Sequence, residues 1–189
     1  DCAAGDPRMQ YLETDPWTND WGATPWLQGV EWLQSGPRPP DYIVFWDDDN
    51  YFHPRALQDM HDALEDKGRP ELLLVPIRSG LTMRPVPGLT IDEYQAGDVD
   101  TANFVVRLDV AVDAARSAAN GVPSRGCDYV LFDAIRSNPD NRIESADIDP
   151  IGIYDGLRPL MRLRWKLRIP PLNIGDAWWW RPIRQALRR

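Results

Sequence analysis

Three consecutive aspartates, Asp47, Asp48 and Asp49, follow directly on an apolar run in DYIVFWDDDNYFHP (residues 41–54). Carboxylates that converge on one point repel each other unless a cation lies between them. Their hard oxygen atoms suit Mg²⁺ or Mn²⁺, which also bind substrate phosphates. We expect Asp47 and Asp49 to be the metal ligands, because strand alternation sends both to the same side. The alternative is a solvated acidic turn.

The elements that must position this triplet are predicted from hydrophobic periodicity and from helix-ending residues. The apolar run before the triplet is typical of a buried strand. Pro54 can begin a helix that ends at Gly68, and Leu57, Met60 and Leu64 share one side of it. Further strands are expected at 71–77, 101–109 and 141–148, a long connection that contains a hairpin at 78–98, and further helices at 24–35, 109–121 and 127–137.

Strands that alternate with helices predict an α/β domain with a mostly parallel sheet flanked by helices. We expect this domain to span residues 1–155 and a basic tail to span residues 156–189. In open α/β sheets, ligands bind at the carboxyl ends of the strands. The three aspartates would then lie at the ligand-binding edge.

The composition is that of a soluble globular protein, with 43% hydrophobic and 26% charged residues in a chain of 189. No apolar run approaches the roughly 18 residues of a membrane span. The two cysteines, Cys2 and Cys127, are too few for a disulfide framework or a zinc site. We therefore expect a reducing, cytoplasmic setting.

Charge is divided unevenly along the chain. Residues 1–155 contain 28 acidic and 12 basic residues and carry −16, whereas residues 156–189 contain one acidic and nine basic residues and carry +8. The acidic body argues against nucleic-acid binding. The tail interleaves Arg and Lys with Leu, Ile and four of the nine tryptophans, a composition that suits an anionic membrane surface. The alternative is a tail that packs on the acidic body.

Four segments stand out by type and order: NDWGATPWLQGVEWL (19–33), YIVFWDDDNYFHPRAL (42–57), GDVDTANFVVRLDVA (97–111) and GCDYVLFDAI (126–135). The second resembles the DxD metal-binding segment of nucleotide-sugar glycosyltransferases with the GT-A fold, and its DDDN form resembles that of β-glucuronyltransferases. The other three resemble parts of family 2 enzymes. Segment 19–33 resembles the stretch before the DxD strand, segment 97–111 resembles the acceptor-side strand, and segment 126–135 resembles the helix that carries the catalytic base. The resemblance covers about residues 8–150.

The resemblance implies roles for the acidic residues. Asp47, Asp48, Asp49 and Asn50 would bind the metal and the donor diphosphate, with Mn²⁺ or Mg²⁺ held by Asp47 and Asp49; Asp48 could instead reach the ribose or the donor sugar. Asp128 matches the base that removes the proton from the acceptor hydroxyl.

Alternatives accompany these roles. Asp128 could instead be an acid favoured by the helix dipole, and Asp133, further along the same predicted helix, is its rival as the base. Asp100, Thr101 and Asn103 would line the acceptor cleft; the alternative for them is ordinary polarity at a strand edge.

The chain departs from the family pattern in three respects. The first part of the nucleotide-binding half is not visible, so we expect an N-terminally incomplete domain that lacks roughly 50 residues of a βαβ unit. Position 127 is Cys, where the family more often has an acid, and this leaves Asp128 as the single acid there. No later histidine is present for the metal; His53 is interpreted as a helix cap or surface residue, and Asp155 as a weak substitute.

These observations predict a metal-dependent, inverting glycosyltransferase. It would move a sugar from a nucleotide-diphosphate donor, with UDP-sugars favoured, to a hydroxyl of a glycan or lipid-linked glycan. We expect it in the cytoplasm, with the tail at the inner face of the plasma membrane. The alternatives are a non-catalytic module derived from the same fold that binds glycan or lipid or acts as a scaffold, and a sugar-nucleotide synthesising nucleotidyltransferase.

Overall fold

The first sheet has four strands in the order β1 (Tyr42–Val44), β6 (Phe104–Arg107), β3 (Leu72–Leu74) and β7 (Ile143–Ser145). It comes from a computed structural model that describes residues 10, 12–13, 23–46, 50–79, 82–85, 89–120 and 127–154. β6 runs antiparallel to both β1 and β3, and β3 runs parallel to β7. β1 and β3 therefore share one direction, with an opposed strand between them.

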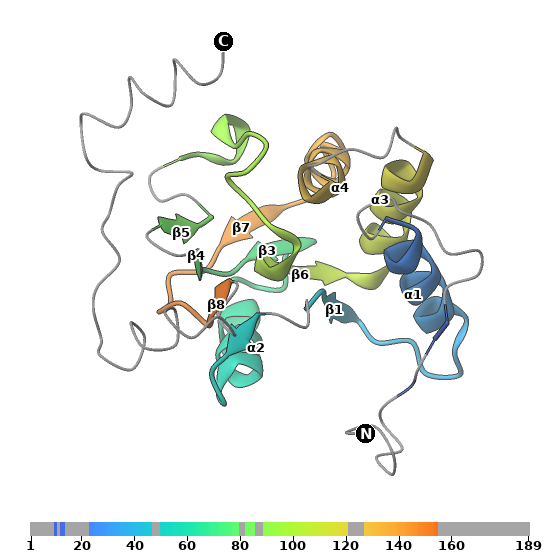
Figure 1. Cartoon of the computed structure of the whole chain (residues 1–189), viewed down its shortest axis with the longest axis horizontal. Helices are drawn as coiled ribbons and strands as arrows, with labels where there is room; N and C mark the ends of the chain where they lie inside the picture. The colour runs from blue at the N-terminus through green and yellow to red at the C-terminus, as the bar shows by residue number, and fades with distance from the viewer. Residues whose placement is uncertain are drawn as a thin grey trace.

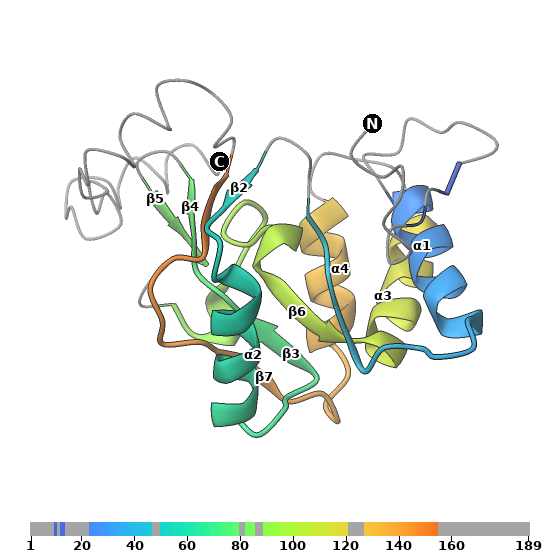
Figure 2. The same ribbon diagram turned by 90° about the horizontal axis from the view of Figure 1, so that it is seen from below.

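The second sheet has the order β2 (Tyr51–Phe52), β8 (Gly152–Tyr154), β4 (Ile77–Ser79) and β5 (Thr82–Arg84). β4 and β5 form the hairpin expected in the connection after β3. Figure 2 shows β2, β4 and β5 near one end of the molecule, beyond β3. β4 follows β3 after only Val75 and Pro76, so the two sheets are joined directly.

The predicted architecture, a GT-A-like and mostly parallel sheet, is contradicted by the strand directions. Four of the six described strand pairings are antiparallel. The described chain between β3 and β6 forms the β4–β5 hairpin and two short 3-10 helices, η1 (Ile91–Glu93) and η2 (Thr101–Asn103), rather than a crossover helix. The chain therefore re-enters the sheet from the edge where β3 ended, and β6 must run in the opposite direction.

The apolar runs do mark strands that are buried on both faces. Leu72 and Leu74 pack in one hydrophobic cluster with Phe104, whereas Leu73 and Val75 pack in another. Continuous apolar sequence thus predicts cover on both faces of a strand. It carries no information about the direction in which that strand runs.

Helices provide this cover (Figure 1). α2 (Ala56–Asp66) packs on the face of Leu73, and α1 (Ala23–Ser35), α3 (Leu108–Asn120) and α4 (Cys127–Arg136) lie on the opposite side. Of the three apolar residues expected on one side of this helix, Leu57 is 60% exposed. The packed face of α2 consists instead of Ala56, Met60, Ala63 and Leu64. Within the described residues, no helix has both the length and the apolar character needed to cross a bilayer.

Candidate functional site

β1 and β3 end at the same edge of the first sheet, where β6 begins. In the register of the sheet, Val44 lies opposite Val105, and Leu74 lies opposite Phe104. We term this the exit edge, and the opposite edge, where β1 and β3 begin, the entry edge. The acidic triplet follows β1 after Phe45 and Trp46, so the chain reaches the triplet at the exit edge.

The triplet itself, Asp47, Asp48 and Asp49, lies outside the described residues, whereas the residues on both sides of it lie within them. Trp46 before it and Phe52 after it stack with ring centroids 4.2 Å apart and ring planes inclined by 16°. Asn50, predicted to bind the cofactor, is buried directly before β2. The chain on the two sides of the triplet is therefore held together by aromatic packing.

Asp100 lies at the same edge, directly before η2 and β6. Its carboxylate accepts a hydrogen bond from the Ala102 amide at 3.1 Å and pairs with Arg84 Nη1 at 2.9 Å. Its side chain is 3% exposed, whereas that of Arg84 is 23% exposed. A buried carboxylate needs such partners, because burying an unpaired charge is costly.

Asn103 connects three segments of the exit edge. Its Nδ2 donates to the carbonyl oxygens of Val75, after β3, and of Arg84, on β5, at 2.9 Å each. Its Oδ1 accepts from the Asp100 amide at 3.0 Å. Thr101 is also buried. The three residues predicted for the acceptor cleft are thus brought together, and the polar contacts of Asp100 and Asn103 stabilise the fold. Acceptor binding by these residues stays a prediction.

Asp128 lies in the first turn of α4, and the direction of α4 follows from two contacts. Phe132 stacks on Phe104 at the exit edge with ring centroids 6.2 Å apart. The Ile135 carbonyl accepts a hydrogen bond from Asn141, next to Arg142 at the entry edge. The N-terminal end of α4, and half-buried Asp128 with it, therefore points toward the exit edge.

The rival acid, Asp133, is already paired within α4. Its Oδ1 accepts a hydrogen bond from Arg136 Nε at 2.8 Å, and it lies further toward the entry edge. His53 fixes the start of α2: its Nδ1 accepts from the Arg55 amide at 3.1 Å, and its Nε2 lies 3.5 Å from Asp59. Asp155 and the tail at 156–189 lie outside the described residues.

A surface pocket of about 570 Å³ opens at the entry edge, away from these acids. Two arginines line it, and both are engaged: Arg69 pairs with Asp41 at 2.9 Å, and Arg107 pairs with Glu71 at 2.6 Å. The remaining lining residues are Gln34, Pro39, Pro40, Asp41, Tyr42, Leu108 and Asp109. Because its cations are neutralised locally, we do not assign this pocket to an anionic substrate.

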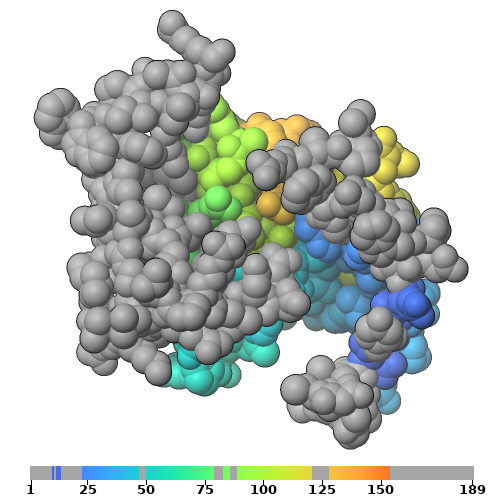
Figure 3. All heavy atoms as spheres, in the orientation of Figure 1, coloured from blue at the N-terminus to red at the C-terminus, as the bar shows by residue number. Residues whose placement is uncertain are grey.

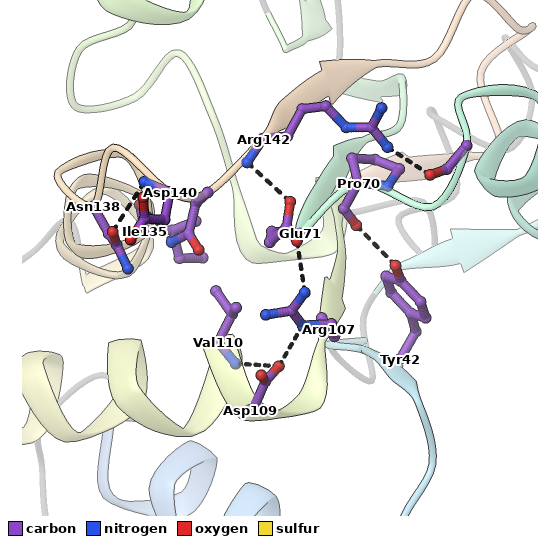
Figure 4. Close-up of polar contacts among 12 residues, drawn as sticks. Tyr42, Pro70, Glu71, Arg107, Asp109, Val110, Ile135, Asn138, Asp140 and Arg142 are labelled. Atoms are coloured by element: carbon purple, nitrogen blue, oxygen red, sulfur yellow. Dashed lines mark hydrogen bonds and ion pairs between the residues drawn. The ribbon is translucent and has the colours of Figure 1, made fainter.

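Figure 4 shows the polar network beside this pocket. Glu71, just before β3, binds Arg107 with one carboxylate oxygen and the Arg142 amide with the other, at 2.6 and 2.9 Å. Arg107 Nε also donates to Asp109 at 2.6 Å. The Arg107 hydrogen bond lowers the pKa of Asp109. For Glu71, partial burial acts in the opposite direction, but the Arg142 amide and the charges of Arg107 and Arg142 lower its pKa overall.

Sequence reasoning did not single out Arg84, Trp46 or Phe52. A cationic partner such as Arg84 could have been inferred, because Asp100 was predicted next to a buried strand and an acidic residue there requires a cation. The stack of Trp46 on Phe52 had no such signal, because it depends on the path of the chain between them.

Among the described residues, no group of three or more His, Cys, Asp or Glu side chains is arranged to hold a metal ion. In comparisons with protein-family models, curated proteins and solved structures, nothing matched this chain. Any assignment of function therefore depends on the residues of the chain and their positions.

Proposed function

We propose that this protein is a metal-dependent, inverting glycosyltransferase that uses a nucleotide-diphosphate sugar, with UDP-sugars favoured. The observation that carries the proposal is a convergence at the exit edge. The segment that leads into the acidic triplet, the Asp100–Asn103 cluster and the N-terminal end of α4 with Asp128 all lie toward this edge.

The metal ligands in this proposal are Asp47 and Asp49, with Asp48 and Asn50 beside them. Hard carboxylate oxygens fit Mn²⁺ or Mg²⁺. The stack of Trp46 on Phe52 supports the fit, because it restrains the chain on both sides of the triplet. A cation bound there would neutralise the departing diphosphate.

Asp128 is the proposed general base. Its carboxylate would take the proton of the acceptor hydroxyl as that oxygen attacks the anomeric carbon and the bond from this carbon to the diphosphate breaks. Asp128 lies in the first turn of α4, and this end of the helix points toward the exit edge. Asp133 is less suited, because it lies further along α4 toward the entry edge.

The acceptor in this proposal is a glycan or a lipid-linked glycan. Asp100, Thr101 and Asn103 would form the wall against which it binds, held in place by Arg84. The basic, Trp-rich tail would bind an anionic membrane and bring the protein to a lipid-linked acceptor. We place the protein in the cytoplasm, with its tail at the inner face of the plasma membrane.

The test is turnover of UDP-sugars by the full-length protein with Mn²⁺ or Mg²⁺. Asp49→Ala should abolish metal-dependent turnover, and Asp128→Asn should lower kcat by about 10²- to 10⁴-fold, the range of general acid–base catalysis. Asp113→Asn, on the exposed side of α3, is the matched control and should change nothing. Unchanged turnover in both site variants would overturn the assignment, and a loss in Asp133→Asn alone would move the base to that residue.

A further inference from the structure

The pocket at the entry edge contains a residue with an unusual backbone conformation. Arg69, which lines it, has a φ of 56°, a region that residues other than glycine adopt only at a cost. Gly68 before it already has the positive φ that ends α2, so the end of the helix does not by itself require a second such residue. In this conformation the Arg69 guanidinium lies over the Tyr42 ring, 5.2 Å from its centre. Backbone strain of this kind is concentrated at binding sites, which makes the pocket a candidate site.

The other walls of the pocket are held in place as well. The Tyr42 hydroxyl donates to the Pro70 carbonyl oxygen at 2.9 Å, which fixes the ring. Arg107, directly across the sheet from Tyr42, is held by Glu71 and Asp109 (Figure 4). The chain that joins α1 to β1 forms the outer wall and lies at the surface, in light blue at the lower right of Figure 3. The pocket is therefore preformed, and its volume of about 570 Å³ is in the range of small-molecule sites.

Four charged side chains line this pocket, two of each sign. The cations, Arg69 and Arg107, lie beside Tyr42, the first over its ring and the second across the strand pair. The acids, Asp41 and Asp109, pair with these cations and reach further into solvent, with side chains 80% and 61% exposed. Ion pairs as exposed as these contribute little to stability, so their members can exchange partners with a ligand at small cost.

We infer that the entry-edge pocket binds a small zwitterion, a molecule that carries an ammonium group beside a carboxylate or phosphate group. An anion alone would be attracted by the two arginines but repelled by Asp41 and Asp109, and a cation alone would meet the reverse. A zwitterion satisfies both signs at once, because its anionic group can pair with the arginines and its ammonium group with the aspartates. An uncharged molecule would gain only the apolar contacts of the pocket.

The apolar part of the lining favours a zwitterion that has a hydrocarbon side chain. Pro39, Pro40, Leu108 and the ring of Tyr42 contribute this surface. An α-amino acid such as phenylalanine supplies both the charges and the hydrocarbon. Phosphoethanolamine, a lipid headgroup, supplies the same two charges without the side chain. Because the pocket lies at the entry edge, this site is separate from the proposed glycosyltransferase site and does not depend on it.

Ligand-observed NMR titrations with the full-length protein test the charge requirement. The probes are L-phenylalanine, its singly charged analogues phenylpropionate and phenylethylamine, and phosphoethanolamine. We expect L-phenylalanine to bind with a Kd on the order of 1 mM. Each analogue should bind about three- to fivefold more weakly, since it lacks one exposed ion pair. Binding of phosphoethanolamine without binding of phenylalanine would identify a headgroup as the source of the zwitterion.

Two variants remove one charge each from the pocket. Asp41→Asn should weaken L-phenylalanine binding about three- to fivefold and strengthen phenylpropionate binding, because it removes an acid that repels the carboxylate. Arg69→Gly preserves the positive φ, which glycine adopts readily, and should weaken L-phenylalanine binding while it strengthens phenylethylamine binding. Opposite effects on the two analogues distinguish recognition of charge from a general loss of structure.

Asp62→Asn and Arg116→Gln are the matched controls, because both side chains are exposed and neither is among the residues that line the pocket. They should leave every affinity unchanged, and thermal melting should show all four variants folded. Equal affinities of the wild type for phenylalanine and its two analogues, or no binding of any probe, would overturn the site. Folded Asp41→Asn and Arg69→Gly variants that bind all probes like the wild type would also overturn it. Since the comparison of analogues uses the wild type, it is decisive even where a variant fails to fold.

Discussion

Gly152 packs directly against the backbone of Tyr51. A Cβ atom at Gly152 would lie 2.5 Å from the Tyr51 carbonyl oxygen and 2.9 Å from Cδ1 of Phe52. Contacts this short cannot be relieved by a side-chain rotation, because one partner is backbone. β8 can therefore pair with β2, immediately after the acidic triplet, only because residue 152 is a glycine.

Gly152→Ala should separate β8 from β2 and destabilise the protein by about 1–3 kcal/mol, the usual cost of overpacking. Because β2 follows the triplet directly, the same change should weaken Mn²⁺-dependent UDP binding. Urea denaturation measures the loss of stability, and calorimetry measures the weaker UDP binding.

Gly29→Ala is the control for this substitution. Gly29 lies inside α1, and a Cβ atom there would meet nothing within 4 Å. Alanine should stabilise that helix by about 0.5–1 kcal/mol. Equal free energies of unfolding for Gly152→Ala and wild type would contradict the close-packing explanation.

The sequence predicted most elements of the fold, because each depends on local pattern. The helix expected at 127–137 is α4, and Phe132 and Ile135 are buried within it. The apolar run at 71–77 supplies β3 and the start of β4. Periodicity and helix-ending residues determine such elements, since their signal lies within one stretch of chain.

Strand direction and pairing were not predictable in the same way. β6 runs against β1 and β3 because of the route taken by residues 75–103, and no residue within β6 encodes that route. The site was predicted in part for the same reason. Asp100 and Asn103 were expected to line the acceptor cleft, but their contacts with Arg84 depend on the β4–β5 hairpin.

Asp100→Asn should destabilise the protein by about 2 kcal/mol, the worth of a hydrogen bond to a charged group. The amide can still accept from Ala102, but it cannot neutralise Arg84. The measurement is a double-mutant cycle with Arg84→Met, in which the cost of Asp100→Asn should fall.

Asp113→Asn provides the baseline for that cycle, because the Asp113 side chain is 83% exposed. We expect it to shift the free energy of unfolding by less than about 0.5 kcal/mol. If the losses in the free energy of unfolding caused by Asp100→Asn and Arg84→Met simply add in the double mutant, Asp100 and Arg84 do not stabilise each other.

Stability should fall in acid through the Glu71–Arg107–Asp109 network. The pKa values of Glu71 and Asp109 lie below their ordinary values of 4.5 and 3.8. A carboxyl whose pKa is depressed by folding contributes stability above its unfolded pKa, and that contribution is lost as pH falls through the folded pKa. The loss should therefore begin below about pH 4.5 and continue as the two carboxyls are protonated.

Glu71→Gln should be about 1–2 kcal/mol less stable than wild type at pH 7, and the difference should shrink at pH 3. Urea denaturation from pH 7 to pH 3 gives the difference in the free energy of unfolding at each pH. Glu65→Gln is the control, since the Glu65 side chain is 47% exposed and pairs with Arg69 rather than with Arg107. Parallel pH profiles for wild type and Glu71→Gln would rule out the network as the source of the acid sensitivity.

The basic tail should bind anionic membranes through its charge. Residues 156–189 carry +8, while the rest of the chain carries −16. Each basic residue near an anionic surface contributes about 1 kcal/mol, so replacing Arg162 and Arg164 by Gln should weaken binding about 30-fold. Co-sedimentation of the full-length protein with phosphatidylserine vesicles measures this, and binding should also fall as salt is raised.

The matched variant for the tail replaces Arg38 and Arg55, two exposed cations of the body, by Gln. It changes the net charge by the same amount, so an effect of overall charge would appear in both variants. A tail that packs on the acidic body instead would give no vesicle binding in wild type, and its neutralisation would lower the free energy of unfolding. Equal vesicle binding by the tail and body variants would likewise reject the tail as the membrane-binding segment.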